Sequence, residues 1–245
     1  MILVIARREL GALFQTPLAW MLLAAAQLLL AWVFLEVLDQ YQGVGAPELE
    51  IGLYAALAER LYGAALLLLL LIAPLLAARS LGQDQQLGTV QLLGSAPVRI
   101  VTILAGKLIA LVAPLWLLAV LPLLLVAWLI GASPLDIGLF LGATLGLCLS
   151  ALLFTSVGLF TASLVQQPTL AAILSYALLI MLSLIHDADQ LASLQLSLLD
   201  WLSWSQHLVW LFNGVARLSD LGYFALMSVL FLALAERQLA NRRLG

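Results

Sequence analysis

The stretch "LIALVAPLWLLAVLPLLLVAWLIG", residues 108–131, decides the fold class, because it contains no charged side chain along its whole length. A helix that crosses the hydrocarbon core of a bilayer needs about 20 mostly apolar residues. A second such stretch, "YGAALLLLLLIAPLLAA", covers residues 62–78. Over the whole chain 64% of residues are hydrophobic and 9% are charged, whereas a soluble domain carries about 25% charged residues. The sequence therefore predicts an integral membrane protein.

Six apolar segments are predicted to span the membrane, each bounded by charged residues, Gly or Pro. They are residues 18–38, 61–78, 103–130, 136–164, 169–186 and 219–236. The fourth and fifth are separated by "VQQPT", where Pro168 interrupts the helix. The expected fold is an all-α integral membrane protein, with residues 1–245 forming a single transmembrane domain.

Residues 1–16 have a different pattern from the spans. Arg7, Arg8 and Gln15 lie on other helical faces than the apolar positions, which are Leu3, Ala6, Leu10, Leu13 and Phe14. This arrangement predicts an amphipathic interfacial helix that lies along the membrane surface. The alternative is that these residues are the frayed start of the first span.

The basic residues predict the orientation of the chain. With six spans, both termini and residues 79–102 share one side, which carries all the Lys and Arg residues except Arg60 and Arg217. Cytoplasmic loops carry the excess of Lys and Arg in membrane proteins. Both termini and the loop at 79–102 are therefore expected to be cytoplasmic.

The cytoplasmic loop at 79–102 has features of its own. In "AARSLGQDQQLGTVQLLGSAP", residues 77–97, Asp84 occupies a first helical turn, Gly88 and Gly94 punctuate the chain, and Pro97 starts the return to the membrane. Its apolar residues for a partner surface are Leu81, Leu87, Val90 and Leu93. We expect two short helical pieces here, with a shape suited to docking a cytoplasmic protein.

The segment "LGQDQQLGTVQLLGSAPVRIVTILAGK" resembles the loop between the second and third spans of type-2 ABC exporter permeases. The matching positions are Gly88-Thr89, Leu92-Leu93, Ala96-Pro97 and Gly106-Lys107, with Asp84 where an acid is expected. The sequence departs from the family pattern at Gln85, Gln86 and Gln91, which replace residues that are often charged. The charge pattern of the partner surface therefore differs from that of the family.

Both ends of the chain show the same resemblance. "ARRELGALFQTPLAW" looks like the family's N-terminal surface helix, with Arg7, Arg8 and Glu9 at the basic-basic-acid place. The C-terminal part is similar to gliding-motility-type permeases through Leu202-Ser203, His207, Gly214-Val215, Asp220 and Tyr223-Phe224. Trp204 stands where Pro is expected, and Asn213 where a basic residue is expected.

The resemblance implies a permease subunit that couples ATP hydrolysis in a separate subunit to conformational change across the membrane, most simply as an exporter. The chain has no G-x-x-x-x-G-K-[ST] phosphate loop. We therefore expect no enzymatic, cofactor or metal site in it, and expect ATP and Mg in two copies of a cytoplasmic ABC ATPase. A second permease copy would complete a homodimer. The resemblance places a coupling helix against the ATPase, with residues Asp84, Leu87, Gly88, Thr89, Gln91, Leu92 and Leu93.

Two other functions fit the same layout. One is a mechanotransmission or assembly complex, like that of gliding motility, which moves no solute and acts on an extracytoplasmic partner. The acidic loop "DQYQGVGAPELEIGLYAALAE", residues 39–59, could contact a single-span outer-domain partner, or could be a solvated connector. The other is a haem-exporter-like permease. The resemblance implies the bacterial cytoplasmic (inner) membrane, and no basic patch with interleaved aromatics indicates nucleic acid.

Polar residues in or near the spans have alternative interpretations. Gln27 is predicted at the dimer interface or the pathway, and Glu36 at an outer gate or simply at the membrane interface. His186, Asp187 and Asp189 are metal-ligand types, but polar residues are also expected where a span ends. Small residues of the fourth span predict close helix packing, with a polar pathway lining as the alternative. These are Gly142, Thr144, Gly146, Ser150, Thr155, Ser156, Gly158, Thr161 and Ser163.

Residues 187–218 are predicted to form an outer-side amphipathic segment. The stretch "WLSWSQHLVW" is rich in aromatic residues around His207. Trp side chains gather at the headgroup level of membranes, which is the expected place of Trp201, Trp204 and Trp210. We expect a helix that partly re-enters the membrane, and no catalytic role for His207.

Overall fold

The computed structural model describes residues 1–42, 53–86, 100–128, 137–192 and 201–244. Within these ranges the chain folds into helices and contains no strand. The helices are α1 (Ile2–Gln15), α2 (Pro17–Gln42), α3 (Leu53–Gln86), α5 (Ile100–Ala127), α6 (Ile137–Leu164), α7 (Pro168–Ala192), α9 (Trp204–Phe212) and α10 (Leu218–Leu244).

Six helices in the described part of the chain are long and apolar enough to cross a membrane. They are α2, α3, α5, α6, α7 and α10, with apolar windows such as Ile100–Ala127 and Ile137–Leu164. Each backbone N–H and C=O must be satisfied inside a span, which helices achieve within themselves. The prediction of an all-α, multi-pass membrane protein with six spans is confirmed at this level.

The second span is much longer than predicted, because α3 runs from Leu53 to Gln86 and not over 61–78 alone. Arg79 and Ser80 end the apolar run but do not end the helix, since polar side chains are compatible with helical backbone. The predicted loop at 79–102 therefore has helical residues at both of its edges. Residues 79–86 continue α3 and 100–102 begin α5, while the remaining residues, 87–99, lie outside the described residues.

The centre of the bundle is the contact between α3 and α6. Gly158 of α6 lies so close to α3 that an added Cβ would stand 2.6 Å from Ala77 Cβ and 3.1 Å from Pro74 Cα. The hydroxyls of Thr155 and Ser150 are buried and donate to carbonyls of their own helix, at 2.7 and 2.8 Å. Small and self-satisfied side chains let two helix backbones approach closely. The packing interpretation of the fourth span is therefore correct.

Tyrosine hydroxyls supply polar contacts within this apolar bundle. The Tyr62 hydroxyl of α3 lies 3.1 Å from Thr144 Oγ1 of α6. The Tyr176 hydroxyl of α7 donates to the Leu71 carbonyl at 2.6 Å, in the turn that precedes Pro74. A proline inside a helix removes a backbone donor, and neighbouring helices in a membrane protein re-satisfy the carbonyls around it. These contacts connect α3 to two of its neighbours.

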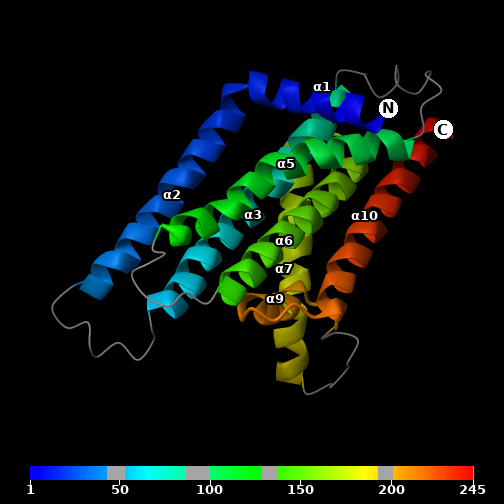
Figure 1. Cartoon of the computed structure of the whole chain (residues 1–245). Helices are drawn as coiled ribbons and strands as arrows, with labels where there is room; N and C mark the ends of the chain where they lie inside the picture. Colours follow the sequence, from blue (N-terminus) through cyan, green and yellow to red (C-terminus); the bar gives the residue numbers. More distant parts are fainter. Residues whose placement is uncertain (43–52, 87–99, 129–136, 193–200, 245) are drawn as a thin grey trace.

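The remaining helices lie around this centre (Figure 1). α2 occupies one edge of the bundle and exposes apolar side chains such as Trp20, Leu28 and Trp32. α1 crosses the end of the bundle where both chain termini lie, and the short α9 lies toward the opposite end. The two ends of the bundle therefore carry different kinds of non-spanning helix.

Candidate functional site

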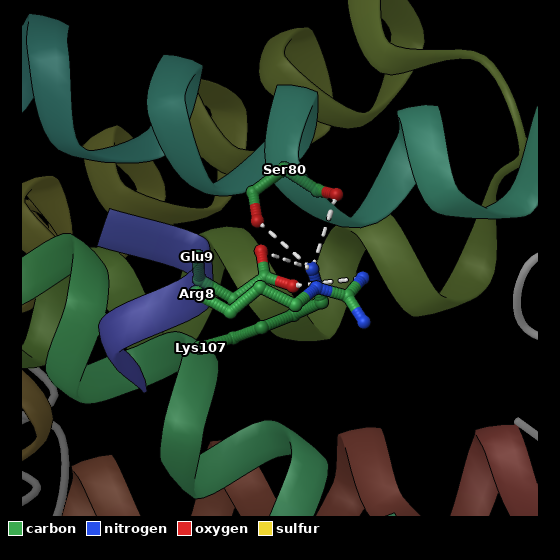
Figure 2. Close-up of polar contacts among 4 residues, drawn as sticks. All are labelled: Arg8, Glu9, Ser80 and Lys107. Atoms are coloured by element: carbon green, nitrogen blue, oxygen red, sulfur yellow. Dashed lines mark hydrogen bonds and ion pairs between the residues drawn. The ribbon is translucent and has the colours of Figure 1, made fainter. Parts of the chain in front are cut away.

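Three helices meet in a buried ion pair at the end of the bundle that carries the termini (Figure 2). Lys107 Nζ of α5 donates to Glu9 Oε2 of α1 at 2.8 Å. The same Nζ lies 3.2 Å from Ser80 Oγ and 3.4 Å from the Ser80 carbonyl of α3. We call Glu9, Ser80 and Lys107 the three-helix junction.

The junction is almost closed to solvent. The Lys107 side chain is 1% exposed and the Glu9 side chain 16% exposed. Arg8 also lies 3.9 Å from Glu9, but its side chain is 64% exposed. A buried ammonium group is tolerated only when it is paired and hydrogen-bonded, whereas an exposed ion pair contributes little. Lys107, and not Arg8, is therefore the cation that fixes Glu9.

The residue before Lys107 allows α1 to come close. An added Cβ at Gly106 would stand 2.7 Å from Ile5 Cγ2 and 3.3 Å from the Ile2 carbonyl. Lys107 is about 10 Å along α5 from Ile100 at 1.5 Å per residue. The Gly-Lys pair therefore supplies both the space in which α1 crosses α5 and the charge that holds it there.

A pocket of about 140 Å³ adjoins the junction. Its polar lining includes Arg8, Arg79 and Thr16 together with Glu9 and Ser80, and its apolar wall comes from α1, α2, α3 and α5. Glu9 is already paired with Lys107, so the guanidinium groups give this pocket a net positive lining.

The predicted interfacial residues lie on α1 as expected for a helix at 1–16. Arg7 and Arg8 are exposed, and Glu9 turns inward to the junction. α1 ends at Gln15, and the chain turns through Thr16 before α2 begins at Pro17. A separate helix thus replaces the alternative of a frayed first span. That it lies on a membrane surface stays a prediction.

Most of the predicted coupling residues lie in segment 87–99, outside the described residues. Asp84 belongs to the last turn of α3, but its side chain is not described. The others lie outside the described residues and are Leu87, Gly88, Thr89, Gln91, Leu92 and Leu93. The junction nevertheless involves the helices on both sides of this segment, through Ser80 of α3 and Lys107 of α5.

Gln27 and Glu36 lie on the exposed surface of α2, away from the junction. Glu36 Oε1 accepts a hydrogen bond from the Gln40 amide at 3.4 Å, and Arg60 donates to the Gln40 oxygen at 2.6 Å. The described structure therefore places no bundle helix over Gln27 or Glu36. Their roles at a dimer interface, pathway or gate stay predictions.

The three Trp side chains around His207 differ in their burial. Trp204 is buried, donates its indole N–H to the Leu179 carbonyl at 2.9 Å, and packs edge-on against Phe154. The buried face of α9 thus turns Trp204 into the bundle, and its place at the headgroup level stays a prediction. Trp201 and Trp210 are exposed. Of the predicted segment 187–218, residues 193–200 lie outside the described residues.

No group of three or more His, Cys, Asp or Glu side chains able to hold a metal ion occurs among the residues described. The side chains of His186, Asp187 and Asp189, at the end of α7, are not described. Comparison of the sequence with models of protein families and with curated proteins found no match.

The junction was missed by sequence reasoning, which used Gly106-Lys107 only as a family landmark. One signal pointed to it: Lys107 is the single charged residue in "IVTILAGKLIALVAP", residues 100–114. An ionisable side chain inside an apolar span requires a partner. The identity of that partner was not readable, because Glu9 lies 98 residues away along the chain.

Proposed function

We propose that this chain is the permease subunit of an ATP-binding cassette transporter, working as an exporter with a separate ATPase. Asp84 and residues 87–93 would form the contact with the ATPase, and ATP and Mg would bind there and not in this chain. A homodimer of permeases with two ATPase subunits is the proposed assembly. The proposal rests on the sequence resemblance and on the three-helix junction.

The observation that carries the proposal is that the junction connects the two helices on either side of segment 87–99. Segment 87–99 begins where α3 ends and finishes where α5 begins, and the junction joins both helices to α1. A displacement of the segment would therefore act on two spans and on the N-terminal helix together. ATP-driven closure of the partner could then bias two arrangements of the bundle, one open to each side.

The charge distribution supports a cytoplasmic position for this end. Arg7, Arg8 and Arg79 belong to it, and Arg237 lies near the end of α10, whose terminus is at the same end of the bundle. An excess of Lys and Arg marks the cytoplasmic side. We propose that both termini and the junction face the cytoplasm at the inner membrane of a bacterium.

The test is purification of the tagged chain from its own cells in mild detergent, with mass spectrometry of the proteins that accompany it. We expect an ATPase with a phosphate loop to accompany the wild-type chain. The Leu92→Asp/Leu93→Asp pair should lose it while the chain still inserts in the membrane. Gly222→Ala is the matched control, because no atom lies within 4 Å of the added Cβ.

Two results would count against the proposal. Recovery of the chain without any ATPase, or with extracytoplasmic proteins only, would contradict the transporter assembly. Recovery of the ATPase with the Leu92→Asp/Leu93→Asp chain would keep the assembly but exclude these leucines as its coupling contact.

A further inference from the structure

A histidine and a carboxylate form a second buried polar cluster, toward the end of the bundle opposite the termini. His207 Nδ1 of α9 lies 2.7 Å from Asp220 Oδ1 of α10. The other ring nitrogen, Nε2, lies 3.1 Å from the Trp201 carbonyl. The side chains of His207 and Asp220 are only 11% and 4% exposed. Neither the proposed transport cycle nor the junction uses this cluster.

The hydrogen-bonding partners of His207 determine how many protons the cluster must hold. A neutral imidazole has one N–H donor, and a carboxylate or a carbonyl oxygen can only accept. His207 faces such an oxygen at each nitrogen, so one contact would be a repulsion between two lone pairs. Two forms satisfy both contacts: an imidazolium beside the Asp220 carboxylate, or an Nε2–H imidazole whose Nδ1 accepts a proton from the Asp220 carboxylic acid.

We propose that His207 and Asp220 together form a buried proton-binding site, in which the pair holds two protons so that both ring nitrogens are hydrogen-bonded. Both allowed forms are electrically neutral as a pair. Loss of the second proton would leave a net negative charge in a buried place, which is costly without compensating partners. It would also remove one of the two hydrogen bonds of the ring.

The surroundings of Asp220 favour the neutral pair. Asp220 Oδ2 is buried and has no hydrogen-bond partner among the described residues. Oδ1 receives, besides His207, only a long contact from the Ser219 hydroxyl at 3.5 Å. A lone carboxylate would therefore be poorly solvated here. The Tyr223 ring stacks on the imidazole with centroids 4.1 Å apart and planes 18° apart, a contact that also suits a protonated ring.

The charged and polar groups described near the pair have other partners and do not compensate the negative charge of Asp220. Arg217, between α9 and α10, places its guanidinium 3.4 Å over the Trp210 ring. The Tyr223 hydroxyl of α10 donates to the Leu202 carbonyl at 2.6 Å. α6, which also packs on α9, contains no Asp, Glu, Lys, Arg or His. Of the other titratable residues on the packed helices, Lys107 of α5 pairs with Glu9, and Tyr176 of α7 donates to the Leu71 carbonyl. Glu236 and Arg237 lie toward the other end of α10. The side chains of His186, Asp187 and Asp189, at the end of α7, are not described.

The number of protons on the pair decides which contacts hold α9, α10 and the residue before α9 together. His207 belongs to α9, Asp220 to the first turn of α10, and the Trp201 carbonyl precedes α9. With two protons bound, both ring nitrogens hold their partners. With one proton, the ring must release either the Trp201 carbonyl or Asp220. The inference concerns this chain alone and does not depend on the proposed transport function.

The experiment counts the protons by nuclear magnetic resonance on the full-length chain in lipid nanodiscs. The chain has two histidines, so His186→Gln leaves His207 as the only imidazole. Nitrogen-15 shifts of its ring and carbon-13 shifts of the Asp220 carboxyl together give the number of bound protons. We expect two protons on the pair, with both hydrogen bonds of the ring present.

Asp220→Asn in the same background is the control. Its amide can donate to Nδ1, so a neutral ring with Nε2–H satisfies both contacts, and the ring should hold one proton at pH 7. A single proton on the wild-type pair at pH 7 would overturn the proposal, even if the variant fails to fold. A ring that stays doubly protonated in Asp220→Asn would also overturn it, because the carboxyl would then not hold the proton.

Discussion

The three-helix junction predicts that neutralising Glu9 and replacing Lys107 cost different amounts of unfolding free energy. Glu9→Gln removes the anionic partner and leaves the Lys107 ammonium, whose side chain is 1% exposed, without it. Removing one member of a buried ion pair costs about 3–5 kcal/mol. Since Ser80 still accepts hydrogen bonds from Lys107, we expect the lower end, a loss of about 3 kcal/mol of unfolding free energy.

Lys107→Met should cost less, although it removes the other member of the same pair. The Glu9 side chain is 16% exposed and has Arg8 nearby, so its carboxylate can be rehydrated, and Met adds apolar area to a buried position. We expect a loss of about 1 kcal/mol. The double variant Glu9→Gln/Lys107→Met buries no charge and should be more stable than Glu9→Gln by about 2 kcal/mol.

The assay is equilibrium unfolding in mixed detergent micelles, combined with hydrogen exchange over Ile2–Gln15 to detect local release of α1. Arg8→Gln is the matched control: its side chain is 64% exposed, and its loss should cost under about 0.5 kcal/mol. Equal costs for Glu9→Gln and Arg8→Gln, or a double variant less stable than Glu9→Gln, would refute the assignment of Lys107 as a buried and paired cation.

Two further predictions concern the packing around α3, and both use the same unfolding assay. Gly158→Ala should cost about 1–3 kcal/mol, because its Cβ would stand 2.6 Å from that of Ala77. Gly63→Ala, where nothing lies within 4 Å, should be neutral or slightly stabilising, and equal effects at the two glycines would contradict the packing. Tyr176→Phe should cost about 1 kcal/mol through loss of the hydrogen bond to Leu71, and no loss would mean that this carbonyl finds another donor.

The spans were predictable because hydrophobic length is a local property of the sequence. The ends of the spanning helices were less predictable. The apolar run ends before Arg79, while α3 continues to Gln86 because nothing in "RSLGQDQQ" prevents helical backbone. Hydropathy therefore predicts where a helix is apolar, but it does not predict how far the helix extends beyond its apolar part.

The polar contacts were not predictable from local pattern. His207 and Asp220 are 13 residues apart on different helices, and only the turn around Gly214, with φ of +78°, brings them together. The burial of Trp204 was not predictable either, because the buried face of α9 is set by packing against α6 and α7. Tertiary packing decided both cases, and a single sequence carries little of that information.

The junction also has a consequence for how the chain is made. Synthesis runs from the N-terminus, so Glu9 and Ser80 leave the ribosome before Lys107 does. When the ammonium of Lys107 reaches the bilayer, the Glu9 carboxylate has already been synthesised and is available to pair with it. The third hydrophobic segment would then enter the membrane with the charge of Lys107 neutralised. In this way α1 would assist the insertion of a later segment of the same polypeptide. A chain whose first residues were moved to its end would lack that help during insertion.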